Sequence, residues 1–245
     1  MCHTPDSRPP APPVNGDVAS SSALTLTSSD GARVLAYQAD PAEPNGRNVI
    51  ILPDVRGLHP YYEALTERFA EAGFGAIAID YFGRTATTDQ RGDSFDHSPH
   101  VQQVRPSQVQ IDVQAAITHL RTHVRGEIFT VGFCFGGSQS WRLAASGLGL
   151  SGVIGFYGKP SLLADISDDL RLPMLLLIAG ADHATPVEEF GAFTKRLDEA
   201  GTPYRKHVFE GAPHSFFDRS FAEWSHYCDQ AWEDILDFTA HPAPA

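Results

Sequence analysis

Residues 129–137 read F-T-V-G-F-C-F-G-G, and this stretch decides the fold. An apolar, β-rich run leads directly into glycines and then into a segment compatible with a helix, so Cys134 is expected on a sharp strand-to-helix turn. Gly132 and Gly136 suit such a turn, because side chains two positions either side of a strained central residue would collide with the strand and the helix. We therefore predict that Cys134 is a nucleophile.

The chemistry of a thiol fits this position. A cysteine at a helix N-terminus lies at the positive end of the peptide dipoles, which favours the thiolate, the nucleophilic form. Gly137 adds room where the helix starts. The alternative is a buried structural cysteine beside glycines that serve only packing, which is common in parallel sheets.

Outward from this turn, short apolar or β-branched runs alternate with longer stretches of helical period. This alternation predicts an α/β fold, with a mostly parallel central sheet of about eight strands and helices on both faces. The runs are ALTLTSS, RVLAYQAD, NVIILP, FGAIAID, EIFTVGF, LSGVIGFYG, PMLLLIAG and YRKHVFEG. The expected helices span residues 60–72, 106–124, 137–147, 186–200 and 220–239. Residues 84–104 have no clear period and form either a functional loop or a plain surface excursion.

The chain of 245 residues fits one domain with one core, which we place at residues 22–240. Residues 1–21 are rich in Pro, Ser, Asp and Ala, and we expect a disordered tail there. A second, flexible tail is expected at residues 241–245.

Composition narrows the class of function. The 18 basic and 30 acidic residues give a net charge of −12, which repels nucleic acid and anionic membranes. No run approaches the roughly 18 apolar residues of a membrane span, and the polar start does not resemble a signal peptide. The three cysteines, Cys2, Cys134 and Cys228, suit a reducing compartment, so we predict a cytoplasmic protein. A redox protein is disfavoured because no C-x-x-C pair is present.

A thiol nucleophile needs a base and a group that orients the base, and both candidates follow strands. Asp182 comes directly after the run PMLLLIAG, and His214 comes soon after YRKHVFEG. Ligand sites in open α/β sheets form at the carboxyl edge of the strands, where both residues are expected. Asp182 could instead cap the helix that follows it.

The other histidines are weaker candidates. His183 is adjacent to Asp182 in sequence and therefore points elsewhere, while His207 and His226 lie inside an expected strand and an expected helix. His59, His97 and His100 lack regular ligand spacing, so we predict no metal site.

Attack on a carbonyl creates an oxyanion, which needs preorganised N–H donors. One donor usually belongs to the residue after the nucleophile, here Phe135. The second is expected from the loop after NVIIL, where Val55 is the candidate.

Taken together, several of these segments resemble the dienelactone hydrolase family over roughly residues 30–239. They are G-F-C-F-G-G, F-Y-G, G-A-D-H-A-T-P, A-P-H-S-F, I-D-Y-F-G-R and P-D-V-R-G. The resemblance implies an α/β-hydrolase fold without a large cap domain, no cofactor, and hydrolysis of a lactone or ester by a Cys-His-Asp triad. Carried over by motif, the triad is Cys134, His214 and Asp182.

The resemblance also implies roles for polar residues around the triad. Asp54 occupies the slot of a family glutamate that contacts the resting thiol, but it is one methylene shorter, so it reaches Cys134 through water or caps the next helix. Arg84 matches one of two family arginines that bind a substrate carboxylate. Arg219 stands one position further from the histidine than the family pattern, and Arg56 and Arg91 are unsupported stand-ins.

We therefore expect an enzyme that acts on a small-molecule lactone or ester, as a monomer or small homo-oligomer. Two rival functions are a general carboxylesterase acting on neutral esters and a non-catalytic scaffold of the same fold that binds a ligand. The complete set of Cys, His and Asp argues against the second, because a binding module has no use for all three.

Overall fold

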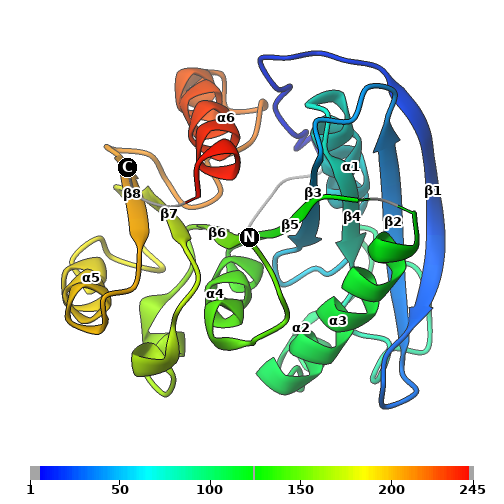
Figure 1. Ribbon diagram of the computed structural model, residues 1–245, viewed down its shortest axis with the longest axis horizontal. Coiled ribbons are helices and arrows are strands. Elements are labelled where there is room, and N and C mark those ends of the chain that lie inside the picture. Colours follow the sequence, from blue (N-terminus) through cyan, green and yellow to red (C-terminus); the bar gives the residue numbers. More distant parts are fainter. Residues whose placement is uncertain (1–5, 124, 243–245) are drawn as a thin grey trace.

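The structure is a computed structural model that describes residues 6–123 and 125–242. Its centre is one eight-stranded sheet with the strand order β1-β2-β4-β3-β5-β6-β7-β8 (Figure 1). The strands are β1 (Val18–Thr27), β2 (Arg33–Pro41), β3 (Arg47–Leu52), β4 (Gly75–Ile79), β5 (Glu127–Phe133), β6 (Gly152–Phe156), β7 (Met174–Ala179) and β8 (Tyr204–Phe209).

The first two strands differ from the rest in direction. β1 and β2 form an antiparallel hairpin, and β2 also pairs antiparallel with β4. The six strands from β4 to β8 in the sheet order are all parallel. Their carboxyl ends therefore meet at one edge of the sheet, so residues that directly follow β3 to β8 are gathered there.

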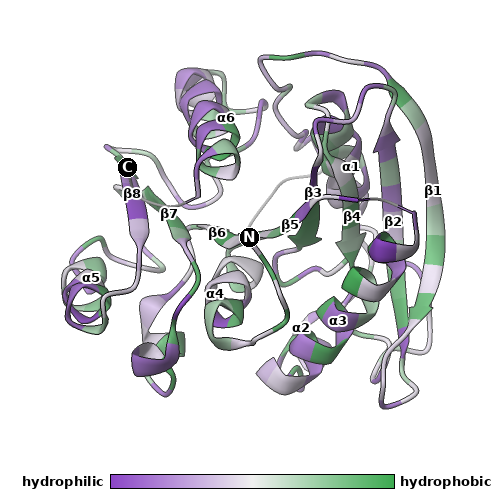
Figure 2. Cartoon of the chain, viewed as in Figure 1, coloured by the Kyte–Doolittle hydropathy of each residue, from purple (hydrophilic) through white to green (hydrophobic). Residues whose placement is uncertain are grey.

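Helices cover both faces of the sheet, as predicted. They are α1 (Pro60–Glu71), α2 (Ser98–Val101), α3 (Pro106–His123), α4 (Phe135–Arg142), α5 (Glu189–Ala200) and α6 (Ser225–Ala240). Buried residues of α1 and α6 belong to one core cluster, and those of α3, α4 and α5 belong to a second cluster on the opposite face. Figure 2 shows hydrophobic colour on the central strands that both clusters share. No helix in the described part of the chain is both long and apolar enough to cross a membrane.

All eight predicted strands and the five predicted helices have counterparts, and the architecture is that of an α/β hydrolase without a large cap. The expected helix at 137–147 begins earlier, with α4, and ends in a 3-10 turn at Leu143–Ala145. The unpatterned stretch 84–104 holds only the single turn of α2.

The N-terminal boundary differs from the prediction of a loose tail over residues 1–21. Residues 1–5 lie outside the described part, but from Asp6 the chain packs on the domain, and β1 already begins at Val18. Prolines lack an N–H group but keep a carbonyl acceptor, and Pro10 uses its carbonyl to accept a hydrogen bond from Trp232 Nε1 at 3.3 Å. Of the predicted C-terminal tail 241–245, the last three residues lie outside the described part.

Candidate active site

Cys134 lies on the turn between β5 and α4, as the sequence predicts. Its backbone has φ 54° and ψ −114°, a left-handed conformation that is costly for any residue other than glycine, on the order of 1–3 kcal/mol. Two hydrogen bonds hold the turn in place: Cys134 N donates to the Phe156 carbonyl at 3.0 Å, and Ser138 N donates to the Cys134 carbonyl at 3.2 Å. The strain is thus supported by the neighbouring strand β6 and by the first turn of α4.

The glycines around Cys134 allow backbone segments to approach very closely. A Cβ atom on Gly132 would lie 1.9 Å from the Gly136 carbonyl oxygen, and one on Gly136 would lie 2.1 Å from the Leu52 carbonyl oxygen. A Cβ atom on Gly137 would lie 2.5 Å from the Phe156 carbonyl oxygen. Contacts this short do not occur, so the turn requires glycine at these positions and packs directly against the ends of β3 and β6.

Asp182 and His214 meet at the same edge of the sheet. His214 Nδ1 lies 2.6 Å from Asp182 Oδ2, and the Asp182 side chain is almost completely buried while that of His214 is 21% exposed. The other Asp182 oxygen accepts hydrogen bonds from the backbone N–H groups of Ala184 at 2.8 Å and Thr185 at 3.3 Å. This carboxylate is therefore fixed by its own turn and oriented toward the imidazole. It does not cap α5, which begins only at Glu189.

Two residues beside His214 have unusual backbone conformations. Tyr157 follows β6 with φ 37°, and its ring centroid lies 4.8 Å from that of His214. Ser215, the residue after the histidine, has φ 63°, and its buried Oγ has no hydrogen-bond partner among the residues that the structure describes. Strained backbone at non-glycine residues gathers at functional sites, and here three such positions, at Cys134, Tyr157 and Ser215, follow the parallel strands β5, β6 and β8.

The loop after β3 carries Val55 and ends at α1. Its backbone meets the start of α4, because a Cβ on Gly136 would lie 2.3 Å from the Pro53 carbonyl oxygen. Val55 is partly buried in this loop, and Phe135 is the first residue of α4. An N–H group in the first turn of a helix has no intrahelical partner, which makes that of Phe135 suitable for an oxyanion.

Asp54 is completely buried in the same loop. Its carboxylate accepts hydrogen bonds from the backbone N–H of Arg56 at 2.9 Å and from Arg56 Nε at 3.1 Å. The suggestion that Asp54 caps the next helix is wrong, because the cap of α1 is His59, whose Nδ1 accepts from Tyr61 N at 3.1 Å. These hydrogen bonds brace the loop that bears Val55, and the contact of Asp54 with the Cys134 thiol stays a prediction.

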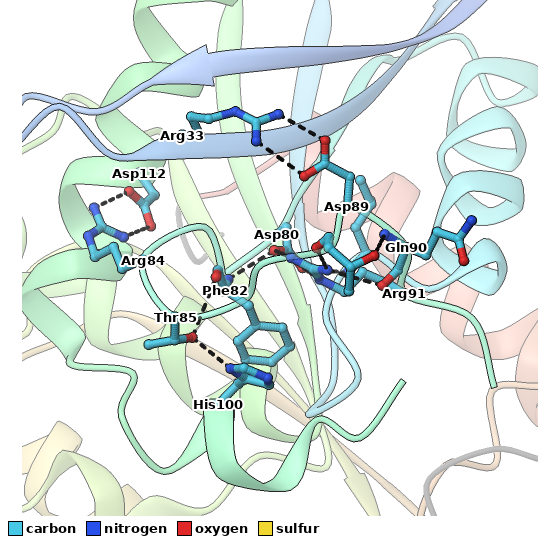
Figure 3. A network of polar contacts seen from close by, with 12 residues as sticks. Arg33, Asp80, Phe82, Arg84, Thr85, Asp89, Gln90, Arg91, His100 and Asp112 are labelled. Carbon is cyan, nitrogen blue, oxygen red and sulfur yellow. Dashed lines mark hydrogen bonds and ion pairs between the residues drawn. The ribbon is translucent and has the colours of Figure 1, made fainter. Parts of the chain in front are cut away.

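A buried ion pair between Asp80 and Arg91 lies behind this loop (Figure 3). The two side chains are 0% and 2% exposed and are joined by hydrogen bonds of 3.0 and 2.9 Å. Asp80 also accepts the backbone N–H of Leu58 at 3.1 Å, and a Cβ on Gly57, which has φ 71°, would lie 2.3 Å from its Oδ1 atom. Asp80 therefore ties the end of β4 to the loop after β3.

The two arginines expected to bind a substrate carboxylate are placed differently. Arg84 is bonded to Asp112 at 2.8 and 2.7 Å and to Asp30 at 2.8 and 3.1 Å. These bonds raise the pKa of Arg84, that to Asp112 most strongly, and Figure 3 shows the Arg84–Asp112 pair. Arg219 is exposed, and its backbone N–H donates to the Arg8 carbonyl at 3.0 Å. Neither arrangement favours the predicted role.

The remaining histidines and the second described cysteine have other surroundings. His59 Nε2 lies 3.0 Å from Asp93, His100 Nδ1 lies 3.0 Å from Thr85 Oγ1, and His207 Nδ1 lies 2.6 Å from Asp234. Within residues 6–123 and 125–242, no group of three or more His, Cys, Asp or Glu side chains is arranged to hold a metal ion. Burial raises the pKa of the Cys228 thiol to about 12, which suits a core thiol.

Sequence reasoning missed Tyr157, Asp80 and the role of Arg91. The tyrosine stands in the quoted F-Y-G after a buried strand, and Asp80 directly follows the buried strand FGAIAI, so position at the carboxyl edge was an available signal for both. Arg91 lies in a stretch without period, and nothing in the sequence points to its partner.

Comparison with known proteins gives a consistent result. The model of the dienelactone hydrolase family matches residues 34–242. A Yersinia pestis protein named as a carboxymethylenebutenolidase is 28% identical over 244 residues, covering 90% of this chain and 89% of its own length. A mouse protein named "Carboxymethylenebutenolidase homolog" is 24% identical and covers 84% of this chain and 86% of its own length.

A solved structure supports the fold. A Klebsiella pneumoniae protein described as a dienelactone hydrolase has a TM-score of 0.76 with 24% identity, covering 91% of this chain and 99% of its own. At this level of identity, the likeness bears on the architecture alone.

Proposed function

The chain belongs to the dienelactone hydrolase family and is a hydrolase of that type, and we propose that it opens a small lactone or ester through a Cys134-His214-Asp182 triad. The observation that carries this proposal is the 2.6 Å contact between His214 Nδ1 and Asp182 Oδ2, at the edge of the sheet where the strained turn presents Cys134. An imidazole held through Nδ1 can exchange a proton through its Nε2 atom.

In the first half of the reaction, His214 Nε2 takes the thiol proton while Cys134 Sγ attacks the carbonyl carbon. The N–H groups of Phe135 and Val55 stabilise the oxyanion. The carbon–oxygen bond to the alcohol then breaks, the alkoxide takes the proton from His214, and a thioester remains on Cys134. For a lactone, the alcohol stays attached to the acyl group.

In the second half, water gives a proton to His214 and attacks the thioester carbon. The carbon–sulfur bond breaks, the thiolate recovers the proton from His214, and a carboxylic acid leaves. Asp182 stays ionised throughout and stabilises the imidazolium that forms in each half. Asp54 and Arg56 brace the loop that holds Val55.

The experiment is to trap the thioester with a slowly hydrolysed aryl ester and to measure the mass of the peptide that contains Cys134 by mass spectrometry. We expect the mass of the acyl group on that peptide, and a loss of turnover of about 10³-fold or more in Cys134→Ala. Cys228→Ala is the matched control, because it also removes a thiol but should keep turnover. Unchanged turnover in Cys134→Ala would refute the assignment.

The cytoplasmic location and the monomeric or small homo-oligomeric state remain predictions from the sequence.

A further inference from the structure

Arg56, Arg84 and Arg91 lie in segments that follow β3 and β4 at the carboxyl edge of the sheet, and each is paired with one or two carboxylates. Arg84 is the most heavily engaged, with two oxygens of Asp112 and two of Asp30 around its guanidinium. A guanidinium offers five N–H donors, and here hydrogen bonds already use four of them. To bind a substrate carboxylate, Arg84 would have to leave two carboxylates that belong to the fold.

Arg91 is committed in a similar way. Besides its two bonds to Asp80, its Nη1 donates to the carbonyl oxygens of Thr88 at 2.6 Å and Gln90 at 3.0 Å. Its guanidinium also lies 4.5 Å from the ring centroid of Phe95. The charge of Arg91 is thus neutralised and its donors are used inside the protein.

Arg56 stands nearest to the proposed oxyanion site in sequence, in the loop that carries Val55. It is 14% exposed and forms an ion pair of 3.1 Å with Asp54, whose own side chain is 1% exposed. Removing one partner from a buried pair leaves the other charge uncompensated, which is strongly unfavourable. Arg56 therefore serves to neutralise Asp54.

Among the paired groups at this edge, carboxylates outnumber guanidinium groups. Three guanidinium groups face five carboxylates, because Asp182 pairs with an imidazole and Arg84 takes two partners. The carboxylates are those of Asp30, Asp54, Asp80, Asp112 and Asp182. Lys159, after β6, and Arg219, after His214, are exposed cations, and water and salt screen their charges.

The buried Tyr81, whose ring contacts Phe135, is affected by two of these carboxylates. Its hydroxyl donates to the Pro53 carbonyl at 2.9 Å, and its ring lies 5.4 Å from that of Phe135. Burial, and then the charges of Asp54 and Asp80, raise the pKa of this phenol well above its ordinary value. A negative charge brought beside Tyr81 meets the same loss of hydration and the same repulsion from these two carboxylates.

We infer that the site is selective for an uncharged lactone or ester and discriminates against a substrate that carries a carboxylate. The inference rests on the proposed function, because that function defines the substrate. The electrostatic preference itself comes from the charged residues of this edge and does not depend on turnover. It can therefore be measured with and without turnover.

The test without turnover compares alkylation of Cys134 by neutral iodoacetamide and by anionic iodoacetate, followed on the peptide that contains Cys134. Relative to N-acetylcysteinamide in the same buffer, we expect the rate ratio of iodoacetamide to iodoacetate to be at least about fivefold higher, and to fall in about 1 M NaCl. A ratio equal to or below that of the free thiol would overturn the inference.

The test with turnover uses 5-oxotetrahydrofuran-2-carboxamide and the corresponding carboxylate, two γ-lactones of the same shape that differ in charge. We expect kcat/KM to favour the carboxamide about tenfold. The ratio should rise in Arg84→Gln, which leaves Asp30 and Asp112 without their partner, and it should be unchanged in a surface control, Arg105→Gln. A preference for the carboxylate that disappears in Arg84→Gln would overturn the inference. If neither lactone nor any aryl ester is cleaved, the proposed function fails, while alkylation still decides the charge preference.

Discussion

The Nδ1 atom of His214 lies 2.6 Å from Oδ2 of Asp182, although the two residues are 32 positions apart. Each side chain follows the end of a parallel strand, Asp182 after β7 and His214 after β8, and these strands are neighbours in the sheet. The parallel sheet thereby brings the two residues together, and the turn at residues 182–185 fixes the carboxylate.

Asp182→Asn should lower kcat for an aryl ester by about 10²–10⁴-fold, because an amide neither fixes the tautomer of His214 nor stabilises its charged form. The thermal midpoint Tm should change little, since the amide oxygen can still accept the N–H groups of Ala184 and Thr185. Asp165→Asn, which alters an exposed partner of Arg142, is the control. A kcat within about threefold of the parent would contradict the proposed role.

Gly136→Ala should prevent stable folding or lower Tm strongly. The added methyl would lie 2.1 Å from the Leu52 carbonyl oxygen and 2.3 Å from the Pro53 carbonyl oxygen, and these backbone atoms cannot move aside as a flexible side chain could. Gly191→Ala is the control, since a Cβ there meets nothing within 4 Å and lies inside α5. Alanine should stabilise that helix by about 0.5–1 kcal/mol. Thermal unfolding of the two variants checks the pair, and equal Tm values would count against the close approach.

Arg91→Ala should lower the free energy of unfolding by about 3–5 kcal/mol, because Asp80 would remain buried without its partner. The control is Arg33→Ala, whose ion pair with Asp89 is 60% and 61% exposed, so that solvent screens it and its loss should change stability far less. Urea denaturation measures both. If the free energy of unfolding falls equally in the two variants, the burial of the Asp80–Arg91 pair does not add to its contribution to stability.

Acidification should destabilise the protein partly through His59. Burial, and to a lesser degree the charge of Arg56, lower the pKa of His59 in the folded state. In the unfolded chain this pKa has its ordinary value of about 6.5. Between these two values the unfolded chain binds the extra proton, so stability is present above about pH 6.5 and is lost as the pH falls through the folded pKa.

His59→Asn should therefore show a smaller fall in Tm between about pH 7.5 and pH 5.5 than the parent. Asparagine is chosen because it keeps a side-chain acceptor for the Tyr61 N–H at the start of α1. The exposed His226 provides the control His226→Asn, which should show the same fall in Tm over this pH range as the parent. The same fall in His59→Asn would contradict the contribution of His59 to acid destabilisation.

Much of this arrangement could be predicted because local patterns decided it. The apolar run of β5 and the glycines beside Cys134 predict a tight turn. Asp182 and His214 each follow a predicted parallel strand, so they are expected at the same edge of the sheet. The pairing of Asp80 with Arg91 could not be predicted, since it depends on the path of a loop without periodicity. Arg84 shows the same limit: a matching motif located the residue but did not reveal that Asp30 and Asp112 surround it.

The N-terminal segment shows a further limit. Its prolines excluded regular structure, but whether it packs depends on surfaces made by residues far along the chain. Arg8 N donates to Asp218 Oδ1 at 2.9 Å, and its carbonyl accepts from Arg219 N. No pattern within residues 1–21 could identify these partners.

These contacts also constrain the order of events during synthesis. Arg8 is synthesised 210 residues before its partner Asp218, and Pro10 is synthesised 222 residues before Trp232. A nascent chain that stops before α6 can already contain the turn at Cys134, but the segment that follows His214 still lacks its contact with that helix, in which Cys228 Sγ donates to the Phe216 carbonyl. Full packing of the active centre therefore comes later in synthesis than the turn at Cys134, because it depends on α6.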